Sequence, residues 1–300
     1  MKLEILPSSV LRHILLLTLI LNTMECTGSD SSNAEYEKEV MDFRQRRVKF
    51  LKSEKGYLNL VGLFWLKEGL NSFGSGIKND LQFPETFPID FGYAKKAGKI
   101  VSFHYNEQVT LKNGQSVTST TIDADDRSQV FSRDSFSWFI LESGGNYAIR
   151  MRDFENPILG EPLYLKFYDI AESWRITGQY TAYEGLKNRN ITNIRDIDYE
   201  QKTPGIITFR RYGKLFTFEP TLSGDGMSVI FMDKTTGKET FAGGRFLVLD
   251  KPDENGDIIL DFNKALNFPC AYNAYTTCPI PPEKNRLPLI VSAGEKTYNN

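Results

Sequence analysis

Residues 261–286 contain the densest group of side chains that could bind a small molecule. The group consists of Asp261, Asn263, Asn267, Asn285 and Arg286, and it lies among prolines and two cysteines. A loop stiffened by prolines loses little conformational entropy on binding, and an arginine can hold a carboxylate or phosphate through two parallel hydrogen bonds. We therefore interpret the segment as a site for a small anionic or polar ligand. The alternative is a proline-rich strap that covers a sheet edge, with its Asn and Asp side chains capping turns.

A second group of polar side chains ends a strand-like run near the middle of the chain. Arg150 and Arg152 alternate with Met151, so both guanidinium groups would face the same side of a strand. Two neighbouring guanidinium groups favour an anionic ligand, and we add Asp153 and Arg245 to this candidate surface. The alternative is a ladder of surface charges that pairs with carboxylates on adjacent strands.

Three aspartates suggest a different kind of function. Asp153, Asp233 and Asp261 each lie at the end or the start of a strand-like run. Two carboxyl groups that converge about 5 to 10 Å apart across a cleft can perform acid–base catalysis, as in glycoside hydrolysis. The alternative function is therefore a hydrolase that uses carboxylates to cleave glycans or another cell-envelope polymer. Asp233 also precedes Lys-Thr-Thr-Gly, which is typical of a turn.

The overall composition excludes several other classes of function. The chain of 300 residues has 36 basic and 38 acidic residues, which argues against a nucleic-acid-binding protein that relies on bulk positive charge. Of its two histidines, only His104 lies outside the N-terminal segment, so a metal site built from several histidines is excluded. The sequence contains no phosphate-binding loop, and we expect no metal and no cofactor. It leaves open whether the protein is an enzyme.

The N-terminal segment is typical of an exported protein. Lys2 and Arg12 precede an apolar run over residues 14–21, which is too short to span a bilayer as a helix. This pattern predicts a secretory signal over residues 1–25. Cys26 then opens a polar tether over residues 26–34, as in a bacterial lipoprotein, and is a candidate lipidation site. The alternative is ordinary cleavage nearby, with Cys26 left free or removed. We expect a periplasmic or outer-surface location, with membrane contact only through the lipid anchor.

The remaining two cysteines lie close together in the sequence. In an oxidising compartment Cys270 and Cys278 would form a disulfide. Closing a loop of this length would stabilise the fold by about 2.6 kcal/mol in the chain-entropy model. The alternative is a metal site, which would need two further ligands, and no histidine is nearby.

Beyond the tether, the sequence predicts one helix followed by β structure. Apolar residues recur on one face of a helix over residues 35–56. From residue 57 on, short runs rich in β-branched and aromatic residues alternate with Gly and Asn turn signals, which is typical of an all-β sandwich or barrel. We expect a mainly β protein with one or two packed lobes, over residues 57–150 and 151–300. The second lobe would end in the proline-rich, cystine-closed strap.

Several stretches of the chain match motifs of one prokaryotic family. They are residues 56–66, 147–153, 233–237 and 243–247, and above all Asp261-Phe262-Asn263, Pro269-Cys270-Ala271, Thr277-Cys278-Pro279 and Asn285-Arg286-Leu287-Pro288. On these motifs the chain resembles the uncharacterised family catalogued as domain of unknown function 1684. The resemblance covers most of the chain after about residue 40, and it implies no particular activity.

A weaker resemblance concerns the first lobe. Residues 65–75 together with Asn79-Asp80-Leu81 look like the opening of a forkhead-associated β-sandwich. Domains of that family bind phosphothreonine through an arginine, and Ser75 stands at the corresponding position in this chain. The resemblance implies a sandwich for this lobe and gives no support to phosphopeptide binding. Together, these features predict an exported β protein that binds a small anionic or polar ligand or a partner protein.

Overall fold

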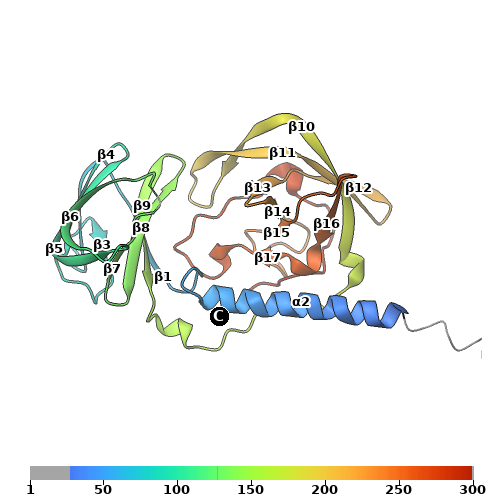
Figure 1. Cartoon of the computed structure of the whole chain (residues 1–300), viewed down its shortest axis with the longest axis horizontal. Coiled ribbons are helices and arrows are strands. Elements are labelled where there is room, and N and C mark those ends of the chain that lie inside the picture. Colours follow the sequence, from blue (N-terminus) through green and yellow to red (C-terminus); the bar gives the residue numbers. More distant parts are fainter. Residues whose placement is uncertain (1–27, 127, 299–300) are drawn as a thin grey trace, which may run out of the picture.

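The computed structural model describes residues 28–126 and 128–298. Within them the protein is mainly β, with one N-terminal α-helix, one near-closed barrel-like sheet and further curled sheets (Figure 1). The predicted fold class is therefore confirmed. The predicted signal segment over residues 1–25 and the predicted lipidation site at Cys26 lie outside the described residues.

Helix α2 (Gly28–Lys52) begins and ends earlier than the sequence predicted. Residues 28–34 of the expected tether belong to the helix. The helix stops before Gly56, where the chain turns back toward the helix end. A Cβ atom on Gly56 would lie 2.3 Å from the carbonyl oxygen of Leu51, so only glycine fits this turn.

One face of α2 packs along the second half of the protein (Figure 1). Tyr36, Val40, Arg47 and Leu51 are buried, and their spacing of four and seven residues places them on one side of the helix. In residues 28–126 and 128–298, no helix is both long and apolar enough to cross a membrane. The four buried side chains hold the helix against the rest of the protein.

Nine strands form one large sheet, which is called the first lobe. Its order is β1-β9-β8-β7-β5-β4-β2-β3, with β6 paired to β5, and every pairing except β2–β3 is antiparallel. The strands are β1 (Leu60–Trp65), β2 (Gly69–Gly74), β3 (Leu81–Gln82), β4 (Gly92–Ala97), β5 (Ile100–Leu111), β6 (Ser116–Asp123), β7 (Phe131–Arg133), β8 (Phe136–Ser143) and β9 (Asn146–Asp153).

Aromatic side chains fill the inside of the first lobe. Alternate residues of β5, including Val101, Phe103 and Tyr105, are buried, as the period of a β-strand requires. Trp138 is buried beside them, and its indole N–H donates to the hydroxyl of Tyr105 at 3.3 Å. The hydrogen bond satisfies the one polar group of each ring, so the aromatic core leaves neither unpaired.

Two four-stranded sheets form the second lobe. Their orders are β12-β11-β10-β16 and β13-β14-β15-β17. The strands are β10 (Arg175–Thr192), β11 (Asp198–Arg211), β12 (Lys214–Phe218), β13 (Thr221–Ser223), β14 (Gly226–Phe231), β15 (Arg245–Leu249), β16 (Asp257–Asp261) and β17 (Leu266–Asn267). Short 3-10 helices are η1 (Pro157–Leu159), η2 (Glu172–Trp174), η3 (Phe262–Lys264), η4 (Pro269–Ala271) and η5 (Glu283–Asn285). Phe218, Phe231, Leu247, Leu260 and Phe262 belong to one buried cluster, so the two sheets share a core.

The chain after β17, residues 268–298, is called the strap. A disulfide joins Cys270 and Cys278, as predicted, over a sequence separation of 8. The strap makes isolated β-bridges to the second lobe, including Pro279 with Asn193 and Arg286 with Met232. These contacts place the strap between the long β10–β11 hairpin and the end of β14.

Reducing the disulfide is expected to lower the free energy of unfolding by about 2.6 kcal/mol, because the cross-link restricts the unfolded chain. In a protein of this size the melting temperature should fall by roughly 5–10 °C, which differential scanning calorimetry with and without reductant would measure. The double variant Cys270→Ala/Cys278→Ala is the control, since its melting temperature should not respond to reductant. If the melting temperature of the wild-type protein does not change with reductant, the disulfide does not stabilise the fold.

Candidate functional site

Arg245 lies inside the second lobe and is 0% exposed. Its Nη2 contacts the carboxylate of Asp233 at 2.5 Å and donates to the carbonyl oxygen of Val291 at 3.1 Å, while Nη1 donates to that of Ala293. Burial lowers the pKa of Arg245, and the Asp233 charge acts in the opposite direction. The expectation that Arg245 joins a basic surface is wrong, because its guanidinium satisfies buried carbonyls of the strap.

Asn267 belongs to the same buried region. Its backbone N–H donates to Glu295 Oε2 at 2.8 Å, and its carbonyl accepts from Arg47 Nη2 at 2.9 Å. Tyr272 donates its hydroxyl to the other oxygen of Glu295, and burial raises the pKa of that carboxyl group. Asn267 therefore helps to join helix α2, strand β17 and the strap.

Asp261 and Asn263 hold the other end of the helix. The Tyr36 hydroxyl donates to Asp261 Oδ1 at 2.8 Å and accepts from Asn263 Nδ2 at 2.9 Å. Asn263 Oδ1 also accepts from the backbone N–H of Ala171 at 3.0 Å, and Lys264 lies 3.3 Å from Asp261. Burial, and then the Asp261 carboxylate, raise the pKa of Tyr36. Both predicted site residues make internal contacts.

The arginines of β9 also contact protein groups. Arg152 donates to the carbonyl oxygen of Gly56 and to Asn59 Oδ1, so it fastens the turn after α2 to the first lobe. Asp153 accepts from Ser135 Oγ at 2.7 Å. Arg150 Nη2 lies 3.5 Å from Thr277 Oγ1 on the strap, and burial lowers the pKa of Arg150 to about 10.

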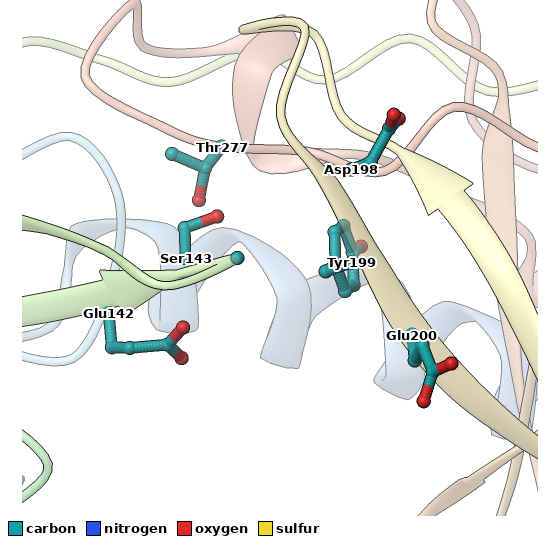
Figure 2. Close-up of a pocket in the computed structure, with 7 residues that line it drawn as sticks. Glu142, Ser143, Asp198, Tyr199, Glu200 and Thr277 are labelled. Atoms are coloured by element: carbon teal, nitrogen blue, oxygen red, sulfur yellow. The ribbon is translucent and has the colours of Figure 1, made fainter.

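Residues of the two lobes and the strap line an open cavity of about 600 Å³ next to this contact. Figure 2 shows Glu142 and Glu200 on opposite sides of the cavity, with the ring of Tyr199 between them. Among the described residues that line it, none is basic. This inter-lobe cavity suits hydroxyl groups or cations better than the anion that the sequence predicted. Its lining is Glu142, Ser143, Gly144, Asp198, Tyr199, Glu200 and Thr277.

A second cavity, of about 550 Å³, lies in the second lobe around the buried carboxylate of Glu219. The side chain of Glu219 is 2% exposed, accepts from the Tyr183 hydroxyl at 2.8 Å and contacts Lys284 Nζ at 3.1 Å. It also forms an ion pair with Arg189. We call this cavity the Glu219 pocket. It is lined by Tyr183, Ile206, Leu215, Phe216, Thr217, Glu219, Lys284, Arg286, Leu287 and Pro288.

Asn285 fixes the backbone beneath the Glu219 pocket. Its Oδ1 accepts from the backbone N–H of Glu219 at 2.8 Å, and its Nδ2 donates to the carbonyl oxygens of Glu219 and Ile230 at 3.0 and 2.9 Å. All of these groups are buried, and an unpaired one would cost about 1–3 kcal/mol. Asn285 therefore fixes the backbone that carries the Glu219 side chain.

Arg286 lines the mouth of the same pocket. Its side chain is 47% exposed, and its Nε lies 3.3 Å from the carboxylate of Glu283. The structure thus brings together two predicted residues, Asn285 and Arg286, with Glu219, Arg189 and Lys284, which the sequence analysis missed. The available signal for Glu219 was its place directly after an apolar strand and before a proline.

Asp233 and Asp261, which were proposed for hydrolysis, line neither the inter-lobe cavity nor the Glu219 pocket. Asp233 accepts from Thr235 Oγ1 at 2.5 Å and pairs with Arg245, whereas Asp261 is held by Tyr36. Within residues 28–126 and 128–298, no group of three or more His, Cys, Asp or Glu side chains is arranged to hold a metal ion. These contacts give no support to a hydrolase that uses Asp233 and Asp261.

Most of the second lobe matches a known protein family. Residues 164–296 match the model of the family described as protein of unknown function (DUF1684). The resemblance to this family is confirmed over these residues, whereas the predicted motifs at residues 56–66 and 147–153 lie outside the match. Every residue that lines the Glu219 pocket lies inside the DUF1684 match, whereas the first lobe lies outside it.

Solved structures give weaker similarities. A solution structure of an uncharacterized protein of Haloarcula marismortui is 28% identical, covering 44% of this chain and 76% of that chain, with a TM-score of 0.38. The FhaA FHA domain, crystallised with the intracellular domain of another protein, is 16% identical, covering 30% of this chain and 97% of its own, with a TM-score of 0.21. No curated protein matches the chain.

The buried Glu295 carboxyl predicts a pH dependence of stability. Its pKa in the folded protein is raised above the usual 4.5, so its contribution to stability is fully present below pH 4.5 and is lost as pH rises through the raised value. The variant Glu295→Gln cannot ionise, so its stability relative to wild type should increase between pH 4 and 8.

Urea denaturation at a series of pH values would measure this difference. The variant Glu254→Gln, at an exposed position, controls for the loss of a surface carboxylate. A relative stability of Glu295→Gln that falls as the pH rises would contradict the expected direction.

Proposed function

We propose that this protein is an exported β protein that binds a small organic ligand in the Glu219 pocket. One observation carries the proposal: the buried carboxylate of Glu219, on a backbone that Asn285 holds in place, lines an open cavity with cations at its mouth. Binding sites need side chains that are held in place by a second layer of contacts. The volume of about 550 Å³ lies in the ordinary range for small-molecule sites.

Binding is the function that the lining supports best. Both oxygens of Glu219 contact protein donors, Oε1 with Tyr183 and Lys284 and Oε2 with Arg189. A carboxylate with these contacts positions the neighbouring cationic side chains. A general base, in contrast, needs a free oxygen that can reach the proton it removes. The lining is also mixed, with apolar walls and a few polar groups, as in many ligand sites.

Export is part of the proposal. Its support is the basic and apolar N-terminal segment, together with the disulfide between Cys270 and Cys278, which is typical of oxidising compartments. Lipid attachment at Cys26 would hold the second lobe close to a membrane surface through helix α2. The inter-lobe cavity and the Glu219 pocket would both lie outside the cytoplasm.

A pocket-filling variant tests the binding site. A ligand present at 100 times its Kd should stabilise the protein by about 2.7 kcal/mol and raise its melting temperature by roughly 5–10 °C. A thermal-shift screen of organic acids, phosphates, sugars and amines would find such a compound. Thr217→Trp should abolish the shift by filling the pocket, whereas Thr118→Trp, at an exposed position on β6 of the first lobe, should keep it.

Two outcomes would count against the proposed site. One is a screen in which no compound shifts the melting temperature of the wild-type protein. The other is a shift that persists undiminished in Thr217→Trp, because the ligand would then bind elsewhere. A shift that is lost in Ser143→Trp but kept in Thr217→Trp would assign binding to the inter-lobe cavity instead.

The anchor at Cys26 is tested separately in cells that export the full-length chain. Cys26→Ser is expected to move the protein from the membrane fraction to the soluble exported fraction, because the substitution removes the thiol that would carry the lipid. Fractionation followed by immunoblotting measures the change. An equal distribution of wild type and variant would rule out the lipid anchor and leave the ligand site untouched.

A further inference from the structure

The Glu219 pocket carries more positive than negative charge around its floor. The carboxylate of Glu219 contacts two cations, Arg189 and Lys284, so one positive charge remains after neutralisation. The Lys284 side chain is 68% exposed while its ammonium stays 3.1 Å from Glu219 Oε1. The surplus charge therefore faces the open side of the pocket, where a ligand can reach it.

Arg286 adds a second available cation at the mouth. Its partner Glu283 is 87% exposed, and a surface ion pair of this kind contributes little because solvent and salt screen it. A ligand anion could therefore replace Glu283 at small cost. The planar guanidinium can then hold a carboxylate or phosphate through two hydrogen bonds, which a lysine cannot do.

The walls of the pocket are apolar on two sides. Ile206, Leu215 and Phe216 come from strands β11 and β12, and Leu287 and Pro288 face them from the strap. Leu215 is 57% exposed, so much of its apolar surface faces solvent. An apolar ligand group lying on Leu215 and Phe216 would remove this surface from water.

From this combination we infer that the ligand is an amphipathic anion: a carboxylate or phosphate group attached to an apolar chain or ring. The anionic group meets Lys284 and Arg286, and the apolar part lies between Leu215, Phe216 and the strap. This inference rests on the proposed function and adds the chemical class of the ligand. The inter-lobe cavity has the opposite charge, with three carboxylates in its lining, and does not fit such a molecule.

Isothermal titration calorimetry with simple probes tests the ligand class. Octanoate and octyl phosphate each carry both features, whereas acetate lacks the apolar chain and 1-octanol and octylamine lack the anion. Octanoate or octyl phosphate should bind at least about tenfold more tightly than acetate, octanol and octylamine. High salt should shrink the difference from octanol and octylamine, because it screens the anion, but not the difference from acetate. Whichever of the two anions binds more tightly distinguishes a carboxylate from a phosphate ligand.

Variants then assign the two features to named side chains. Arg286→Gln should weaken binding of the preferred anion about tenfold through loss of the charge, and Leu215→Ser should weaken it through loss of apolar contact. Arg46→Gln is the matched control, because Arg46 lies exposed on helix α2 and does not line the pocket, so its loss should change affinity less than twofold. Circular dichroism of each variant confirms that the fold is kept.

The results separate the inference from the proposed function. Octanol or octylamine binding as tightly as octanoate would overturn the anionic class. If the thermal-shift screen finds a neutral or cationic ligand whose effect is lost in Thr217→Trp, the pocket binds ligands and the inference is wrong. If neither the probes nor the screen produce binding, both statements fall.

Discussion

The buried ion pair between Arg245 and Asp233 is the interaction on which the second lobe depends. An arginine that is 0% exposed needs partners for its charge and its N–H groups, and here Asp233 and carbonyl oxygens of the strap provide them. Removing one partner of a buried pair typically costs about 3–5 kcal/mol, because the other charge stays buried. Strand β15 thereby holds the last part of the chain, including Val291 and Ala293, in one position.

That position determines where the Glu219 pocket forms. The strap backbone runs beside β14, with the N–H of Leu287 donating to the carbonyl of Met232 at 2.8 Å. Asn285 therefore reaches Glu219, and Lys284 and Arg286 on either side of it point to the mouth of the pocket. Helix α2 is tied to the same framework, because Arg47 donates to the carbonyl of Asn267 and lies 3.9 Å from Glu295.

Charge is divided between two cavities, although the formal net charge of the chain is only -2. The inter-lobe cavity collects Glu142, Asp198 and Glu200, whereas the Glu219 pocket collects Lys284 and Arg286 at its rim. A cavity focuses the field of its own lining, so the electrostatic potentials of the two cavities differ in sign. The net charge of the whole chain does not show this difference, because the residues that line each cavity come from distant parts of the sequence.

The sequence by itself determined the features that depend on neighbours along the chain. The period of the β-strands, the N-terminal helix and the close cysteine pair are local patterns, and the structure has all three. The same reasoning singled out Asn267, Asn285 and Arg286 without separating a ligand site from an internal contact.

Only the tertiary structure made that separation, because the decisive partners are far apart in sequence. Asn285 binds Glu219 across 66 residues, Tyr36 binds Asp261 across 225, and Arg47 reaches Asn267 across 220. An asparagine or arginine side chain has the same hydrogen-bonding groups in either role. Whether those groups face solvent or a buried partner is set by packing, which no local pattern records.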